Sequence, residues 1–78
     1  MSVQAYILVQ TEVGKAADVA KAIADIDGVS MAEDVTGPYD VIVRASAANM
    51  DDLGALVISK VQSVKGITRT LTCPIVTL

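Results

Sequence analysis

The chain has 78 residues, carries a net charge of −3, and contains one cysteine and no histidine. So small a domain is only marginally stable alone, and a single cysteine excludes an internal disulfide, so we expect oligomerisation to supply stability to a chain that is 53% hydrophobic. The acidic balance and the scattered cations argue against direct DNA binding, and the missing histidine removes the commonest general base.

The first half of the chain reads as strand, helix, strand. Residues 4–10 form an apolar, β-branched run that is typical of a central strand. From Ala16 onward, apolar residues recur at helical spacing, and this pattern stops at Gly28, where glycine is the preferred residue after a helix. Residues 29–36 then predict a second strand, which Gly37-Pro38 ends with a turn.

The second half repeats this order. Residues 40–45 predict a third strand, and Asn49 is a suitable N-cap for a helix whose apolar stripe covers residues 53–64. Residues 67–78 predict a long fourth strand. The halves correspond at a fixed offset, with Ile23, Ile26, Gly28 and Val29 matching Val61, Val64, Gly66 and Ile67.

This repetition predicts one domain over residues 1–78, with a ferredoxin-like α+β fold of βαββαβ order. Both helices are expected on one face of a four-stranded antiparallel sheet. The first and third strands are apolar at successive positions, so the other face should also be covered. We expect a second copy there, which gives a twofold dimer of the dimeric α/β-barrel type.

The segment between the second and third strands, Thr36-Gly37-Pro38-Tyr39-Asp40, has a composition that suits a ligand. Gly37 lets a ligand approach the backbone, Tyr39 offers an aromatic wall, and Asp40 offers a carboxylate for an ammonium group. The alternative is an ordinary β-turn in which Asp40 caps its own backbone. The five residues alone leave both interpretations open.

Further candidates lie on the fourth strand. Thr68, Thr70 and Thr72 alternate, so we expect them to share one face, where their hydroxyls can bind a ligand or simply suit a strand. Cys73 has no histidine partner and is expected to be a small buried hydrophobe rather than a nucleophile. Arg69, like Arg44 on the third strand, can hold an anion, although ion pairing is the commoner role.

Other classes of function find little support. The acidic residues between Asp25 and Asp34 lack the spacing of a metal loop, so we expect no metal and no other cofactor. No charged segment followed by a long apolar run opens the chain, and no uncharged run approaches the length of a membrane span. We therefore expect a cytoplasmic protein that does not contact membranes.

Two of these segments resemble the effector-binding domain, or RAM domain, of the Lrp/AsnC family of amino-acid-responsive transcription regulators. Residues 36–40 are similar to the family's Thr-Gly-x-Tyr-Asp between strands two and three. Residues 65–72 are similar to its Pro-Gly-Val followed by a threonine-bearing strand, with Lys65 in place of the proline. The resemblance covers essentially the whole chain.

The resemblance implies a dimer that assembles further, commonly into an octamer of four dimers, with amino-acid effectors bound between dimers. It carries Gly37, Tyr39 and Asp40 over as ligand-binding residues and, less directly, Thr70 and Thr72. Family members also have an N-terminal helix-turn-helix domain, whereas the first strand here begins close to the N-terminus. The chain therefore resembles a stand-alone effector domain, with full-length Lrp/AsnC regulators as candidate partners.

We thus expect a non-enzymatic module that binds an amino acid or similar small metabolite and oligomerises. One alternative is a small dimeric α/β-barrel enzyme of the monooxygenase or isomerase kind, against which stands the lack of a paired acid and base. Another is a purely structural domain that co-assembles with full-length regulators.

Overall fold

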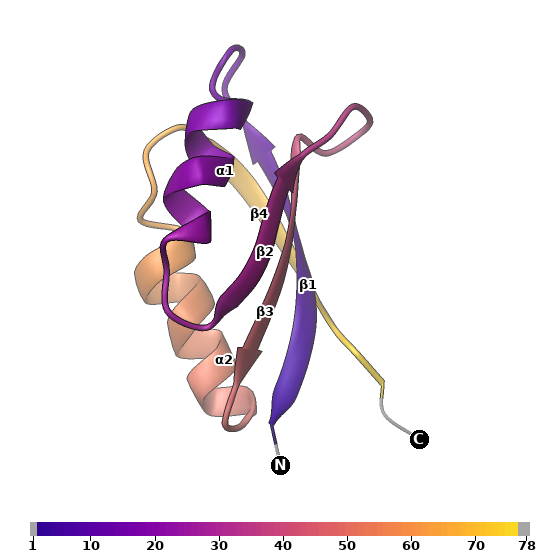
Figure 1. Ribbon diagram of the computed structural model, residues 1–78, viewed down its shortest axis with the longest axis vertical. Helices are drawn as coiled ribbons and strands as arrows, with labels where there is room; N and C mark the ends of the chain where they lie inside the picture. The colour runs from indigo at the N-terminus through magenta and orange to yellow at the C-terminus, as the bar shows by residue number, and fades with distance from the viewer. Residues whose placement is uncertain (1, 77–78) are drawn as a thin grey trace.

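The computed structural model describes residues 2–76 of the chain. The elements follow the expected strand-helix-strand order twice (Figure 1). They are β1 (Val3–Thr11), α1 (Ala16–Ala24), β2 (Val29–Asp34), β3 (Val41–Ala47), α2 (Met50–Leu56), the π-helix η1 (Val57–Val61) and β4 (Ile67–Pro74). The ferredoxin-like prediction is therefore confirmed.

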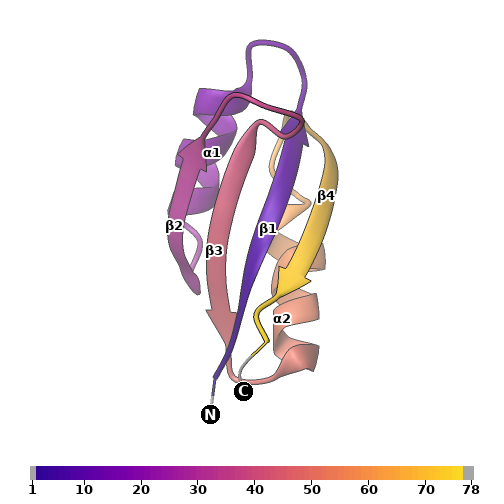
Figure 2. The ribbon, with the colours of Figure 1, turned by 90° about the vertical axis from the view of Figure 1, so that its right-hand side faces the viewer.

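The four strands form one antiparallel sheet in the order β2-β3-β1-β4. Both helices cover the same face of this sheet, and Figure 2 looks onto the opposite face, which no helix or strand formed by residues 2–76 covers. Leu8 marks the middle of that open face, because it pairs with Ile42 of β3 on one side and with Leu71 of β4 on the other.

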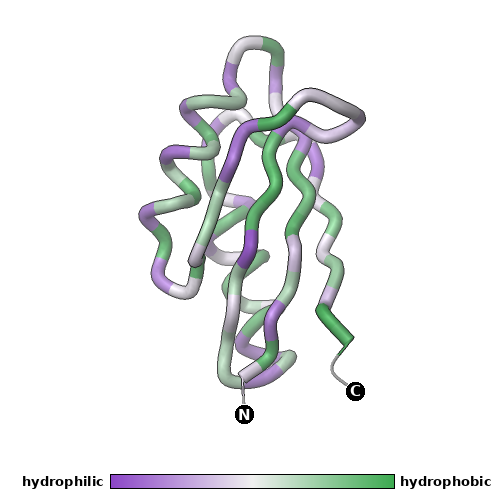
Figure 3. Tube along the Cα trace, turned by 45° about the vertical axis from the view of Figure 1, so that its right-hand side comes forward, coloured by the Kyte–Doolittle hydropathy of each residue, from purple (hydrophilic) through white to green (hydrophobic). Residues whose placement is uncertain are grey.

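The core lies between the sheet and the helices. Side chains along a strand alternate between its two faces, and the alternate residues of β1 and β3 that point toward the helices are 0% exposed: Ala5, Ile7, Val9, Val41, Val43 and Ala45. All of these except Ala5 form one cluster with buried side chains of the helical segments, namely Val19, Ala20, Ile23, Val57 and Val61. The hydrophobic stretches along the central strands are visible in Figure 3.

The internal repeat is visible in the backbone. Gly28 and Gly66 follow the two helical segments with φ of 97° and 99°, a region that favours glycine. Their carbonyl oxygens accept hydrogen bonds from the amides of Ser46 at 2.7 Å and of Glu12 at 2.8 Å. Each glycine thereby attaches a helix-to-strand connection to the end of another strand, Gly28 to β3 and Gly66 to β1.

The second helix differs from its prediction in one respect. Asn49 caps it as expected, because its side chain accepts a hydrogen bond from the Asp52 amide at 2.8 Å. The regular α-helix ends at Leu56, however, and continues as η1, in which the Gln62 amide reaches the Val57 carbonyl at 2.9 Å. A π-turn inserts one extra residue into the helical repeat.

The fourth strand is shorter than predicted. It ends at Pro74, whereas the apolar composition favoured a strand as far as Leu78. Proline has no amide hydrogen to donate to a neighbouring strand, which makes it a natural end point. Thr77 and Leu78 lie outside the described residues.

Candidate functional site

The β2–β3 loop folds across the end of β1 (Figure 2). The Asp40 amide donates to the Val9 carbonyl at 2.8 Å, and the Gln10 side-chain amide donates to the Pro38 carbonyl at 3.0 Å. Within the loop, the Val35 amide donates to the Asp40 carbonyl at 2.8 Å. These bonds attach the loop to β1 through Pro38 and Asp40.

Asp40 is half-buried, and its carboxylate is already part of the fold. Its Oδ2 accepts a hydrogen bond from the Thr11 amide at 2.8 Å. The carboxylate therefore caps a backbone amide of β1, whereas the β-turn alternative expected it to cap its own turn. An ionised carboxylate offers about four lone-pair sites, so one backbone bond leaves capacity for a ligand.

Gly37 and Tyr39 complete the loop. Gly37 has a φ of 156°, and a Cβ built on it would meet no atom within 4 Å. The space beside its backbone is therefore open to a ligand, and glycine is needed there for conformation rather than for packing. Tyr39 is half-buried and lies directly before Asp40.

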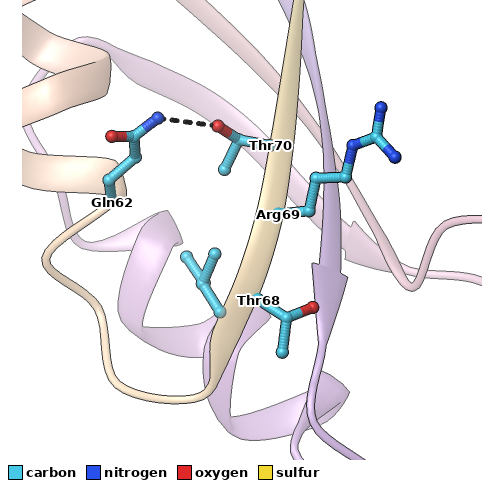
Figure 4. Close-up of a pocket in the computed structure, with 5 residues that line it drawn as sticks. Gln62, Thr68, Arg69 and Thr70 are labelled. Carbon is cyan, nitrogen blue, oxygen red and sulfur yellow. Dashed lines mark hydrogen bonds between the residues drawn. The ribbon is translucent and has the colours of Figure 1, made fainter.

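The two threonines predicted as ligand-binding residues lie on the other side of the sheet. Thr70 pairs with Val9 and Thr72 with Ile7, whose side chains are buried against the helices. The Thr70 hydroxyl accepts a hydrogen bond from the Gln62 side-chain amide at 2.9 Å (Figure 4). Within one chain, the structure therefore separates Thr70 and Thr72 from the loop by the thickness of the sheet.

Thr72 also lines an apolar cavity of about 250 Å³ between β4 and the second helical segment. Its other lining residues are Met50, Leu53, Gly54, Val57 and Ile58. Most of this lining is aliphatic, so the Thr72 hydroxyl is the polar group available to anything that enters.

The prediction that all three threonines share one face is wrong for Thr68. The register between β1 and β4 shifts at Gln10/Thr11, so that Thr11 pairs with Ile67 and Gln10 with Arg69. Such a bulge breaks the alternation. As a result Thr68 and Arg69 are both exposed, while Ile67 packs against the core.

Sequence reasoning missed the part played by β1. Gln10 and Thr11 each donate a hydrogen bond to the loop, although they are distant from it in sequence. The only signal was a polar pair at the end of an apolar run, which is common at strand ends. Recognising these residues required the register of β1 with β3.

The open face carries an ordered group of side chains around Arg44. The Arg44 guanidinium donates to the Tyr6 hydroxyl at 2.9 Å and to Gln4 Oε1, and lies 5.4 Å from the centroid of the Tyr6 ring. Cys73, which pairs with Tyr6, is exposed. The expectation of a buried Cys73 is therefore wrong for the single chain, because alternation along β4 points the residue after the helix-facing Thr72 toward the open face.

Residues 2–76 offer neither a metal site nor a membrane-spanning helix. No group of three histidine, cysteine, aspartate or glutamate residues in this part of the chain is arranged to hold a metal ion. In the same range, no helix is long and apolar enough to cross a membrane.

Residues 4–77 match the family profile of the Lrp/AsnC ligand binding domain. An uncharacterised HTH-type transcriptional regulator of Pyrococcus furiosus is 38% identical over 55 residues, which are 70% of this chain and 37% of that protein. The chain thus spans little more than a third of the regulators that it matches in sequence.

Solved structures share the fold. A protein of Thermus thermophilus superimposes with a TM-score of 0.90 at 25% identity, and the match covers 97% of this chain and 95% of that one. A transcriptional regulator of Neisseria meningitidis, solved in complex with L-Met, gives a TM-score of 0.83 at 19% identity over 96% of this chain and 50% of that one.

Proposed function

Because this chain belongs to the family of Lrp/AsnC ligand binding domains, we propose that it binds an amino acid or a similar small zwitterion and oligomerises. The family and the regulator relatives establish a regulator-related effector-binding module. The nature of the effector and the assembly are the parts proposed here.

The observation that carries the proposal is the anchored β2–β3 loop. Asp40 is held by the Thr11 amide and keeps lone pairs for an ammonium group, while the backbone beside Gly37 is open. A preorganised carboxylate next to accessible backbone suits a zwitterion, because ordering costs little on binding. The L-Met bound by the Neisseria meningitidis regulator, which shares this fold, is of that chemical class.

Thr70 and Thr72 lie on the opposite face of the sheet from the β2–β3 loop, which limits how one ligand can contact both. These residues face the helices, whereas the loop lies at the edge of the open face. A ligand that touches both the loop and the threonines must therefore contact two chains. We place the binding site between neighbouring copies, which makes assembly a condition of binding.

The open face supplies the first contact between copies. Tyr6 is 38% exposed and Leu71 43% exposed, and Leu8, which pairs with both Ile42 and Leu71, is half-buried, as is Ile42. A contiguous apolar surface of this kind is typical of an interface. A second copy that packs its own open face there forms a closed twofold dimer.

We assign no catalytic role to the chain. An enzyme of the same strand order needs a general acid and base positioned together at a substrate. The Asp40 carboxylate is engaged with backbone, and the chain has no histidine to act with it. Co-assembly with full-length regulators remains compatible with ligand binding and is proposed as a second role.

A thermal-shift screen against the twenty amino acids tests this function. A ligand that binds only the native state stabilises it by about 2.7 kcal/mol at 100 times its Kd, so we expect at least one amino acid to raise Tm by several degrees. Calorimetry then gives the affinity and the number of sites per chain. The absence of any shift across the panel at millimolar concentration would contradict the proposal.

A further inference from the structure

Three residues lie in a row across one end of the sheet. Arg69 of β4 pairs with Gln10 of β1, and the pairing of Val9 with Val41 places Asp40 beside Gln10 on the opposite side. Neighbouring strands are about 4.8 Å apart, so the backbones of Arg69 and Asp40 are separated by roughly 10 Å. A cation and a carboxylate thus flank Gln10.

The Arg69 side chain points toward the open face. Figure 4 shows it extending from β4 away from the hydrogen-bonded pair of Gln62 and Thr70, which lies on the helix side. Gln10 is also directed to the open face, because its neighbour Val9 is fully buried on the other one. From there Gln10 reaches the Pro38 carbonyl of the loop.

The two arginines of the open face differ in their surroundings. Arg44 is tied to Tyr6 and Gln4. Among the hydrogen bonds of residues 2–76, none engages the guanidinium of Arg69, which is exposed. A guanidinium is a planar fork of donors that matches a carboxylate in a bidentate manner.

We infer that Arg69 holds the carboxylate of the zwitterionic ligand whose ammonium group Asp40 receives. The inference rests on the proposed function. The ammonium and carboxylate of an α-amino acid are only a few ångströms apart. Because strand side chains project out of the plane of the sheet, the roughly 10 Å between the two backbones leaves room for these groups above Gln10. Gln10 acts as a positioning residue, because its bond to Pro38 holds the loop against β1 and its own pairing with Arg69 places that arginine beside it.

The test compares each amino acid that binds the wild type with its carboxamide, which keeps the ammonium group and lacks the carboxylate. Calorimetry should show that the wild type binds the acid about tenfold to a hundredfold more tightly than the carboxamide. Arg69→Gln should bind the acid no more tightly than the carboxamide, while its affinity for the carboxamide should equal that of the wild type. Arg69→Lys retains the positive charge but lacks the planar guanidinium. Its affinity for the acid should therefore lie between those of the wild type and Arg69→Gln.

Lys21→Gln is the matched control, since it removes one exposed cation from α1 and should leave both affinities unchanged. Equal affinity of the wild type for acid and carboxamide overturns the inference without any variant. Unchanged binding of the acid to Arg69→Gln overturns it as well, while the proposed function stands. If the wild type binds no amino acid, the proposed function fails together with the inference.

Discussion

At the scale of single residues, Asp40 combines a structural role with the proposed binding role. Its carboxylate accepts the Thr11 amide, and its own amide donates to Val9, so one residue attaches the loop to β1 by side chain and by backbone. The same carboxylate is the proposed partner of an ammonium group. A substitution must therefore be chosen that separates the two roles.

Asp40→Asn makes that separation. The asparagine Oδ1 can still accept from the Thr11 amide, but the charge that attracts an ammonium group is lost. A charge-assisted hydrogen bond contributes about 1.5–3 kcal/mol, so we expect amino-acid affinity measured by calorimetry to fall about tenfold to a hundredfold with oligomer mass unchanged.

Asp51→Asn, on the exposed side of α2, serves as the control and should not alter affinity. Equal affinities of wild type and Asp40→Asn would limit Asp40 to its capping role. Loss of the oligomer in Asp40→Asn would instead show that the carboxylate acts through structure.

The loop residues themselves were accessible from the sequence, because glycine, proline, tyrosine and aspartate in one short segment have few joint explanations. Their anchors were not. Gln10 and Thr11 lie in a different strand, and their role depends on a register that sequence pattern does not specify. Thr70 and Thr72 were found as a pair, but the face that they occupy relative to the loop also depends on this register.

At the scale of elements, Gly28 of the first half of the fold and Gly54 of the second half have opposite roles. Gly28 ends the connection from α1, where a Cβ would lie 2.7 Å from Leu56 Cδ1 and 3.0 Å from the Ser46 carbonyl oxygen. Gly54 lies inside α2, where a Cβ would meet nothing within 4 Å. The first glycine is required by the fold, whereas the second weakens a helix.

Gly28→Ala and Gly54→Ala should therefore shift the free energy of unfolding in opposite directions. A left-handed backbone costs a non-glycine residue about 1–2 kcal/mol before the steric clash is added, so Gly28→Ala should be destabilising. Gly54→Ala should be stabilising by about 0.8–1.0 kcal/mol. Urea unfolding at one fixed protein concentration measures both, and a stabilised Gly28→Ala would contradict this account of the turn.

Element order and helix faces followed from periodicity, which is why the βαββαβ order was predictable. The π-turn of η1 was not, because Leu53, Val57 and Val61 keep an apolar spacing that suits a regular helix equally well. The bulge at Gln10/Thr11 was also missed, since it arises from pairing between β1 and β4 rather than from either strand.

At the scale of the whole molecule, the sheet has a filled face and an open one. The helix side is completed by residues of the same chain, whereas the open side presents Tyr6, Leu8 and Leu71 to solvent. The sequence predicted this imbalance from the uninterrupted apolar runs of β1 and β3. It did not predict the Arg44 cluster, which gives the open face a fixed polar group beside its apolar centre.

Leu8→Lys tests whether the open face is the interface between copies. Light scattering of the wild type at micromolar concentration should give a mass of at least two chains. Each copy of a twofold dimer contributes its own Leu8, and burial of a leucine contributes about 1.5–3 kcal/mol, so the substitution should weaken dimerisation by at least about a hundredfold. The single chain should stay folded, because in it a lysine at this half-buried position can extend to water.

Val13→Lys adds the same charge at a fully exposed turn and should leave the mass unchanged. A wild-type mass of one chain would exclude the dimer, and an undiminished mass of Leu8→Lys would move the interface away from the open face.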